Sequence, residues 1–215
     1  MRTCLQLEKA FKEELPPAFQ HDDVRYPESL VRHFLQEFTQ AGDVVFDPFA
    51  GYGTTLIVAE AMGRIPFGLE LDEAKVNYVR ARLRQPQNLI HGDTRRLLAY
   101  DLPEFDFSLT SPPYMSRDDE EDPFTNYTAK GRGYRAYLRD IRSIYGQLRQ
   151  GMKRGGTVVI EASNLKIEGT LTTLAWDIAR EVSEVLRFEG EVVVGWDKAY
   201  GYGYDHSYCL VFSAL

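Results

Sequence analysis

One stretch decides the fold of this chain: Val44-Val45-Phe46-Asp47-Pro48-Phe49-Ala50-Gly51-Tyr52-Gly53-Thr54-Thr55. Its first three residues form a short apolar run, which indicates a buried strand, and its end opens a helix expected over residues 54–63. Gly51 and Gly53 let the turn bring the backbone close to a ligand, because glycine has no Cβ. The helix N-terminus after such a turn suits an anionic group, a carboxylate as readily as a phosphate. Position 56 is Leu and no Gly-Lys-Ser/Thr is present, which excludes a dinucleotide fingerprint and a Walker phosphate loop.

Strands and helices alternate after this stretch. The expected elements are strands over residues 65–71, 88–91, 105–109 and 157–161, and helices over residues 73–84, 134–153 and 170–187. This alternation predicts an α/β fold with a doubly wound, mostly parallel sheet. Two closing strands, near 190–197 and 206–213, lie too close together for a helical crossover. We expect them to pair antiparallel and to complete a seven-stranded sheet.

Acidic residues end two of the predicted strands. Glu70 lies about 20 residues after the glycine loop, where a carboxylate can bind ribose hydroxyls, and Asp93 ends the third strand, where it can face an adenine amino group. The carboxyl ends of parallel strands meet along one edge of the sheet, so both are expected beside the loop. The sequence therefore predicts a site for a nucleoside-containing cofactor at this edge.

A second motif, Ser111-Pro112-Pro113-Tyr114, follows the fourth strand at the same edge. The two prolines fix φ twice and hold the preceding carbonyl in a set direction. The Ser111 oxygen and the Pro112 carbonyl can together accept both hydrogens of a planar amino group and free its lone pair to attack a methyl group. Tyr114 can stack on a flipped base. A rigid turn with a buried tyrosine is the alternative interpretation, which the position of the motif disfavours.

Length and composition favour one globular domain. The chain has 215 residues, of which 44% are hydrophobic, enough to fill one core. We expect a single domain over 1–215 with a helical extension over 1–22, centred on an amphipathic helix at 5–15, and an insertion loop over 115–133. No apolar run reaches membrane-span length and no secretory segment opens the chain, so a cytoplasmic location without membrane contact is expected. Two cysteines and four histidines show neither a disulfide framework nor metal-binding spacing.

The charges are unevenly distributed. The formal net charge of −7 argues against a free-standing, high-affinity nucleic-acid binder. Basic residues nevertheless gather between 130 and 154, and the candidates for phosphate contacts are Arg132, Arg135, Arg139 and Arg142. A solvated helix face explains this stripe equally well. The acidic run 118–122 could repel or mimic phosphate, although a solvated loop tip is the favoured interpretation. Phe124 and Tyr127, just after it, are candidates for stacking or for packing.

Both motifs resemble those of the amino-group DNA methyltransferases, which modify cytosine N4 or adenine N6. Arg25-Tyr26-Pro27-Glu28-Ser29-Leu30 resembles their additional N-terminal motif, and Trp196-Asp197-Lys198 with 206–212 resembles their closing strands. The resemblance implies a Rossmann-like class I methyltransferase with S-adenosyl-L-methionine as cofactor. It also implies the cofactor-binding set Tyr26, Asp47, Pro48, Phe49, Gly51, Gly53, Thr54, Thr55, Glu70 and Asp93, and the catalytic set Ser111, Pro112, Pro113 and Tyr114. Serine at position 111 favours cytosine N4, and DNA methylation within restriction-modification is the implied setting.

Two departures from this family keep alternatives open. The cofactor motif precedes the catalytic motif, which is also the order in many RNA methyltransferases. Only about residues 199–205 join the closing strands, so a typical target-recognition domain does not fit. Either the loop 115–133 reads the nucleic acid, or a partner subunit or second copy does, or specificity is loose. The alternatives are an RNA base methyltransferase, a glutamine-amide protein methyltransferase, disfavoured by Ser111, and a cofactor-binding subunit of an active partner, disfavoured by the intact catalytic motif.

Overall fold

The computed structural model describes residues 2–214, so the two terminal residues of the predicted domain lie outside it. A central sheet has the strand order β1-β9-β10-β6-β5-β2-β3-β4. The strands are β1 (Cys4–Leu7), β2 (Val44–Asp47), β3 (Ile65–Glu70), β4 (Leu89–His91), β5 (Phe105–Thr110), β6 (Met152–Ala162), β9 (Arg187–Trp196) and β10 (His206–Ser213). β10 pairs antiparallel with both neighbours, whereas the other pairs are parallel. The predicted mixed sheet with an antiparallel closing pair is therefore confirmed, with one strand more than expected.

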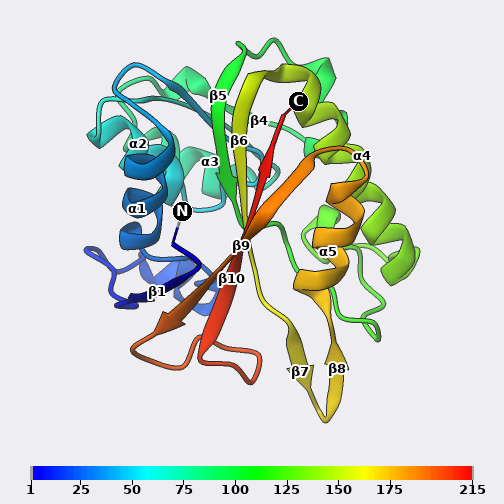
Figure 1. Ribbon diagram of the computed structural model, residues 1–215. Helices are drawn as coiled ribbons and strands as arrows, with labels where there is room; N and C mark the ends of the chain where they lie inside the picture. Colours follow the sequence, from blue (N-terminus) through cyan, green and yellow to red (C-terminus); the bar gives the residue numbers. More distant parts are fainter. Residues whose placement is uncertain (1, 215) are drawn as a thin grey trace.

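Helices cover both faces of this sheet, with α1, α2 and α3 on one side and α4 and α5 on the other (Figure 1). Their bounds are α1 (Glu28–Phe38), α2 (Thr54–Ala61), α3 (Glu73–Arg80), α4 (Tyr134–Gly151) and α5 (Leu174–Ser183). Short 3₁₀ turns lie at Pro17–Asp22, Pro86–Asn88, Thr94–Ala99 and Pro123–Thr125. None of the helices within residues 2–214 is long and apolar enough to cross a membrane.

The helix predicted over residues 5–15 is wrong. Cys4–Leu7 forms the edge strand β1, which pairs in parallel with β9 in the register Leu5 to Val194 and Leu7 to Trp196. The pairing satisfies backbone groups that the edge of β9 would otherwise expose, and it buries Leu5. An isolated helix of this length is marginal in water, so these tertiary contacts override the weak helical pattern.

The helix predicted over residues 170–187 is shorter than expected. Thr170–Thr172 forms β8, which pairs with β7 (Leu165–Ile167) in a hairpin that projects beyond the sheet (Figure 1). The turn residues Glu168 and Gly169 have φ values of 48° and 85°, as a two-residue hairpin turn requires. α5 therefore begins only at Leu174.

Side-chain alternation along the central strands divides the core between the two faces. Phe46 and Ile160 belong to the cluster beneath α4 and α5, whereas their neighbours Val45 and Val159 belong to the cluster beneath α1. A smaller cluster joins α2 and α3 to the sheet. All these side chains are buried, so both faces are closed. Ligands then have access to the strands at the carboxyl edge of the sheet, where β2 to β6 end together.

Candidate active site at the carboxyl edge of the sheet

Asp47 ends β2 and is fully buried. Its Oδ1 accepts a hydrogen bond from the Phe49 amide at 3.0 Å, and its Oδ2 accepts one from the Tyr26 hydroxyl at 3.3 Å. The same tyrosine hydroxyl bonds to the Thr55 hydroxyl at the start of α2. Burial raises the pKa of Asp47 to about 6, although the nearby Thr110 hydroxyl and the hydrogen bond from the Phe49 amide act in the opposite direction. The predicted neighbours Tyr26, Asp47 and Thr55 thus form one buried cluster.

The glycine loop adopts the backbone that its sequence predicts. Gly51 and Gly53 have φ values of 52° and 77°, in the left-handed region, and Gly53 caps α2 directly before Thr54. A Cβ at Gly53 would lie 2.5 Å from a methyl group of Val79 on α3. The loop is anchored from its other side by Pro48, whose carbonyl accepts a hydrogen bond from the Thr94 hydroxyl. The loop backbone therefore lies closer to its neighbours than a side chain would allow.

Glu70 ends β3 directly beside this loop. Its two carboxylate oxygens accept hydrogen bonds from the Gly51 amide at 2.7 Å and from the Asp72 amide at 2.8 Å. Burial raises the pKa of Glu70, and these two backbone hydrogen bonds partly oppose the rise. Each oxygen retains a second lone pair for a ligand hydroxyl. The structure thus brings Glu70 and Gly51 into direct contact, as expected when the carboxyl ends of parallel strands meet along one edge of the sheet.

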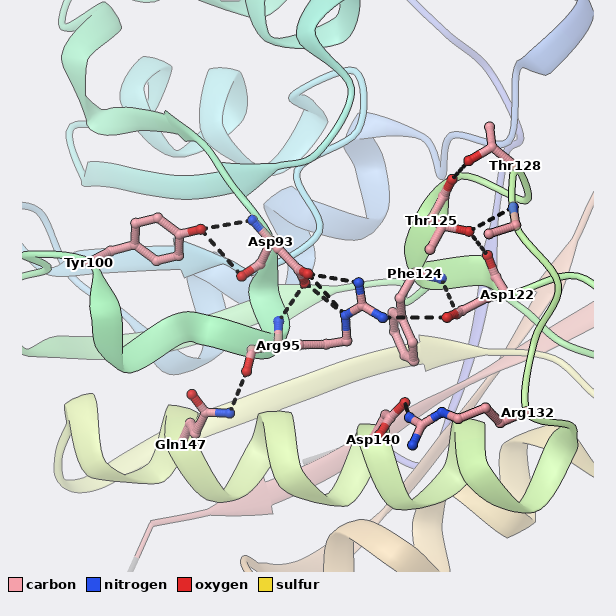
Figure 2. Close-up of polar contacts among 11 residues, drawn as sticks. Asp93, Arg95, Tyr100, Asp122, Phe124, Thr125, Thr128, Arg132, Asp140 and Gln147 are labelled. Carbon is pink, nitrogen blue, oxygen red and sulfur yellow. Dashed lines mark hydrogen bonds and ion pairs between the residues drawn. The ribbon is translucent and has the colours of Figure 1, made fainter.

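Asp93 follows β4 and is held by Arg95, a residue that the sequence did not single out (Figure 2). The carboxylate accepts from Arg95 Nε at 3.0 Å and from Nη2 at 2.7 Å. The Asp93 amide donates to the Tyr100 hydroxyl at 2.8 Å. Burial would raise the pKa of Asp93, but the hydrogen bonds and charge of Arg95 outweigh burial and lower it. Asp93 therefore stays ionised at the edge of the site.

The same arginine ties the insertion loop to β4 (Figure 2). Arg95 Nη1 lies 3.4 Å from a carboxylate oxygen of Asp122, and its guanidinium lies 5.8 Å from the ring centroid of Phe124. Phe124 is buried and its ring stacks against Phe49 of the cofactor loop, with centroids 6.0 Å apart. Phe124 thus has a packing role against Phe49. The last residue of the predicted acidic run, Asp122, forms an ion pair with Arg95.

The second motif lies after β5, which pairs with β2 and therefore ends beside the cofactor loop. Pro112 is buried, whereas Ser111 and Tyr114 are half-buried. The Pro113 carbonyl accepts a hydrogen bond from the Tyr137 hydroxyl of α4 at 3.0 Å. The Tyr114 carbonyl accepts one from the Tyr127 hydroxyl of the insertion loop at 2.7 Å. Side chains from α4 and from the loop therefore fix the backbone of the motif.

A buried carboxylate that the sequence reasoning missed lies beside this motif. Glu161, near the end of β6, is 1% exposed. Its Oε2 accepts from the Tyr114 hydroxyl at 3.2 Å and its Oε1 from the Tyr200 hydroxyl at 2.6 Å. The sequence does offer one indication of this residue: Glu161 is a single acidic residue at the end of the apolar strand 157–161, at the same edge as Asp47 and Glu70.

Two of the four candidate arginines are engaged in ion pairs. Arg132 pairs with Asp140 at 2.7 Å and Arg142 with Glu181 of α5 at 3.4 Å, while Arg135 and Arg139 are exposed. α4 begins at the carboxyl edge and runs toward the opposite edge. Arg142 therefore lies about 10 Å further from the site than Arg135. A role in phosphate binding stays a prediction.

No cluster of His, Cys, Asp or Glu in the described part of the chain could hold a metal ion.

Known proteins share parts of this sequence. Residues 6–81, which include the loop from Asp47 to Thr55, match the family model of the N6/N4 DNA methylases. The resemblance predicted from the motifs is confirmed over this region. A stretch of 59 residues is 41% identical to the Type II methyltransferase M.HinfI of Haemophilus influenzae, covering 27% of this chain and 16% of that protein. Another, of 67 residues, is 36% identical to the orphan methyltransferase M.BamHII of Bacillus amyloliquefaciens, covering 31% and 25%. The chain thus matches a quarter or less of these relatives' length.

Solved structures share the whole fold. TrmN from Thermus thermophilus superposes with a TM-score of 0.61 at 18% identity, covering 93% of this chain and 52% of that protein. A SAM-dependent methyltransferase from Methanosarcina mazei gives 0.61 at 10% identity, with coverages of 85% and 97%. The N-methyltransferase NodS of Bradyrhizobium japonicum gives 0.60 at 10% identity, with coverages of 91% and 87%. The predicted Rossmann-like methyltransferase fold is therefore confirmed.

Proposed function

We propose that this chain is an S-adenosylmethionine-dependent methyltransferase that acts on the exocyclic amino group of a base in DNA, with cytosine N4 as the target. One observation carries the proposal. The glycine loop after β2 and the Ser-Pro-Pro-Tyr motif after β5 lie at the ends of two paired strands. A cofactor held by Gly51 and a base held by Ser111 would then meet at one sheet edge. The match of residues 6–81 to the DNA methylases supports the choice of substrate.

The residues of the loop fit this cofactor chemically. S-adenosylmethionine carries a sulfonium and an ammonium cation as well as ribose hydroxyl donors. Asp47 and Glu70 are buried acceptors whose pKa burial raises, so a nearby cation would favour their ionised forms. The ring of Phe49, against Phe124, offers an aromatic face to a sulfonium. Asp93 would accept from the adenine amino group, and Tyr26 would cover the site.

The chain's own residues act on the target amino group. Ser111 and the Pro112 carbonyl accept its two hydrogens and draw the nitrogen toward a tetrahedral shape, which frees the lone pair. Tyr114 supplies the ring on which the base stacks, and its hydroxyl contact with Glu161 keeps that ring in place. When bound, the cofactor supplies an electrophilic methyl group on its sulfonium sulfur.

Methylation of RNA is the second candidate. The motif order favours it, as does the short connection between β9 and β10, which spans residues 197–205 and leaves no room for a recognition domain. The insertion loop, a partner subunit or a second copy would then contribute specificity. Phosphate contacts from Arg132, Arg135, Arg139 and Arg142 would serve either nucleic acid.

The deciding experiment is transfer from isotopically labelled S-adenosylmethionine to bulk DNA and bulk RNA, followed by digestion to nucleosides and mass spectrometry. We expect N4-methylcytosine from DNA. N6-methyladenine would change the target base, and label in RNA alone would establish the second candidate. Absence of label in both, with the cofactor bound, would refute base methylation by this chain alone.

Ser111→Ala tests the assigned chemistry. We expect kcat to fall roughly hundredfold, the scale on which one preorganised hydrogen bond at a reacting atom changes turnover. The cofactor Kd should change less than about twofold, as measured by titration calorimetry. Ser183→Ala is the matched control, because that hydroxyl bonds to the Ala179 carbonyl within α5. An equal loss of cofactor affinity in Ser111→Ala would contradict the role given to Ser111.

A further inference from the structure

Glu161 is a buried carboxylate whose role in the proposed chemistry so far is to hold the Tyr114 ring in place. It is 1% exposed, and hydroxyl groups surround it. The hydroxyls of Tyr114 and Tyr200 donate to its two oxygens at 3.2 Å and 2.6 Å. The hydroxyls of Ser111 and Ser207 lie close enough to the carboxylate to lower its pKa. Glu161 therefore contacts Tyr114, the last residue of the catalytic motif, and lies beside Ser111, the first.

The surroundings of Glu161 hold the carboxylate without a cationic partner. Within residues 2–214, no ion pair joins Glu161 to a lysine or an arginine. The titratable groups that face it come from four parts of the chain: Tyr114 after β5, Tyr200 after β9, Cys209 on β10 and Tyr26 before α1. A buried, unpaired carboxylate destabilises a fold unless hydrogen-bond donors satisfy it. Here the hydroxyls of Tyr114 and Tyr200 satisfy it, and the Ser111 hydroxyl lies beside them.

The proposed reaction requires a proton acceptor at this place. When the amino nitrogen attacks the methyl carbon, an N–C bond forms and the C–S bond breaks with its electron pair on sulfur. The nitrogen is left with a positive charge and one proton too many. A serine hydroxyl is too weak a base to keep that proton, but it can receive one proton while passing its own to a neighbouring carboxylate.

We propose that Glu161 is the proton acceptor behind Ser111, taking up as a carboxylic acid the proton that the methylated nitrogen loses. This inference rests on the proposed function. Proton uptake is favoured at Glu161 because burial raises its pKa, whereas the surrounding hydroxyls of Tyr200, Ser207, Ser111 and Tyr114 hold that rise in check. A base whose pKa is moved toward neutrality accepts a proton more readily at physiological pH.

The test is the single-turnover methylation rate as a function of pH in wild type, Glu161→Gln and Tyr200→Phe. Glu161→Gln should lower the rate at about pH 8 by at least roughly hundredfold. In wild type the rate should fall at low pH as Glu161 becomes protonated, and this part of the fall, the acid limb of the profile, should be absent in Glu161→Gln. Its cofactor Kd should stay within about twofold. Tyr200→Phe removes a hydrogen bond that lowers the pKa of Glu161, so the limb should move to higher pH. Asp47 titrates in all three proteins and so cannot produce these differences.

Glu189→Gln is the matched control, because this carboxylate accepts from Ser213 at the opposite edge of the sheet. Its rate and pH profile should equal those of wild type. If wild type transfers the methyl group but Glu161→Gln and Tyr200→Phe have the same acid limb as wild type, this inference alone would be overturned. Absence of transfer by wild type would overturn the proposed function and this inference with it. If Glu161→Gln fails to fold by circular dichroism, the shift in Tyr200→Phe decides.

Discussion

Asp47→Asn measures how much a buried carboxylate destabilises the fold around the site. Burial raises the pKa of Asp47 from 3.8 to about 6. The folded state therefore binds this proton more tightly than the unfolded state. The resulting stability is fully present below about pH 3.8 and is lost as the pH rises through about 6. At pH 7 and above the loss amounts to about 3 kcal/mol, because each tenfold change in proton affinity corresponds to about 1.4 kcal/mol.

Asparagine keeps an oxygen that can accept from the Phe49 amide, as Asp47 Oδ1 does, but it does not titrate. The free energy of unfolding of Asp47→Asn relative to wild type should therefore rise by about 2 kcal/mol between about pH 4.5 and about pH 7.5. Urea unfolding followed by circular dichroism measures both values. The comparison cancels the titration of Glu70 and Glu161, which is common to both proteins. A difference that is the same at both pH values, or that moves in favour of wild type, would refute the burial argument.

Two further predictions concern the loop and its tether. Gly53→Ala should raise the cofactor Kd at least about tenfold in calorimetry, because its Cβ meets a valine side chain at 2.5 Å. Gly155→Ala has a similar φ with nothing within 4 Å, so it carries only the backbone strain of about 1 kcal/mol; equal Kd values in both variants would contradict the steric reason. Arg95→Ala should speed limited proteolysis of the insertion loop about fivefold by freeing Asp122. Arg132→Ala, which breaks a more exposed pair, should not, and equal rates would show that the Arg95 tether does not restrain the loop.

Local patterns were enough to predict the cofactor loop and its position. An apolar run, two glycines and a helix start specify the turn from β2 into α2. The rule that parallel strands end at one edge then placed Asp47, Glu70, Asp93 and Ser111 together. The structure confirms that common edge, since β2 pairs with both β3 and β5.

Long-range partners explain what the sequence did not predict. β1 exists because Leu5 pairs with Val194, and no local pattern in four residues can indicate such a partner. Arg95 bonds to Asp122, which is 27 residues away in the sequence, and Glu161 bonds to Tyr200, which is 39 residues away. A single charged residue in an ordinary context gives no periodic signal, so these contacts become visible only when the chain is folded.

The electrostatics of this edge fit a cofactor that loses its positive charge when it reacts. Asp47, Glu70 and Glu161 are buried at the ends of three strands, and burial raises the pKa of each. Without the bound cofactor, burial makes each ionised form destabilise the fold, although the charge of Lys75 offsets part of this effect at Glu70. A sulfonium would relieve part of that destabilisation, whereas the thioether left after methyl transfer is neutral and would not. The same carboxylates would therefore bind the reactive cofactor more tightly than its product, and the protonation of Glu161 would remove one negative charge at the step when the cation disappears.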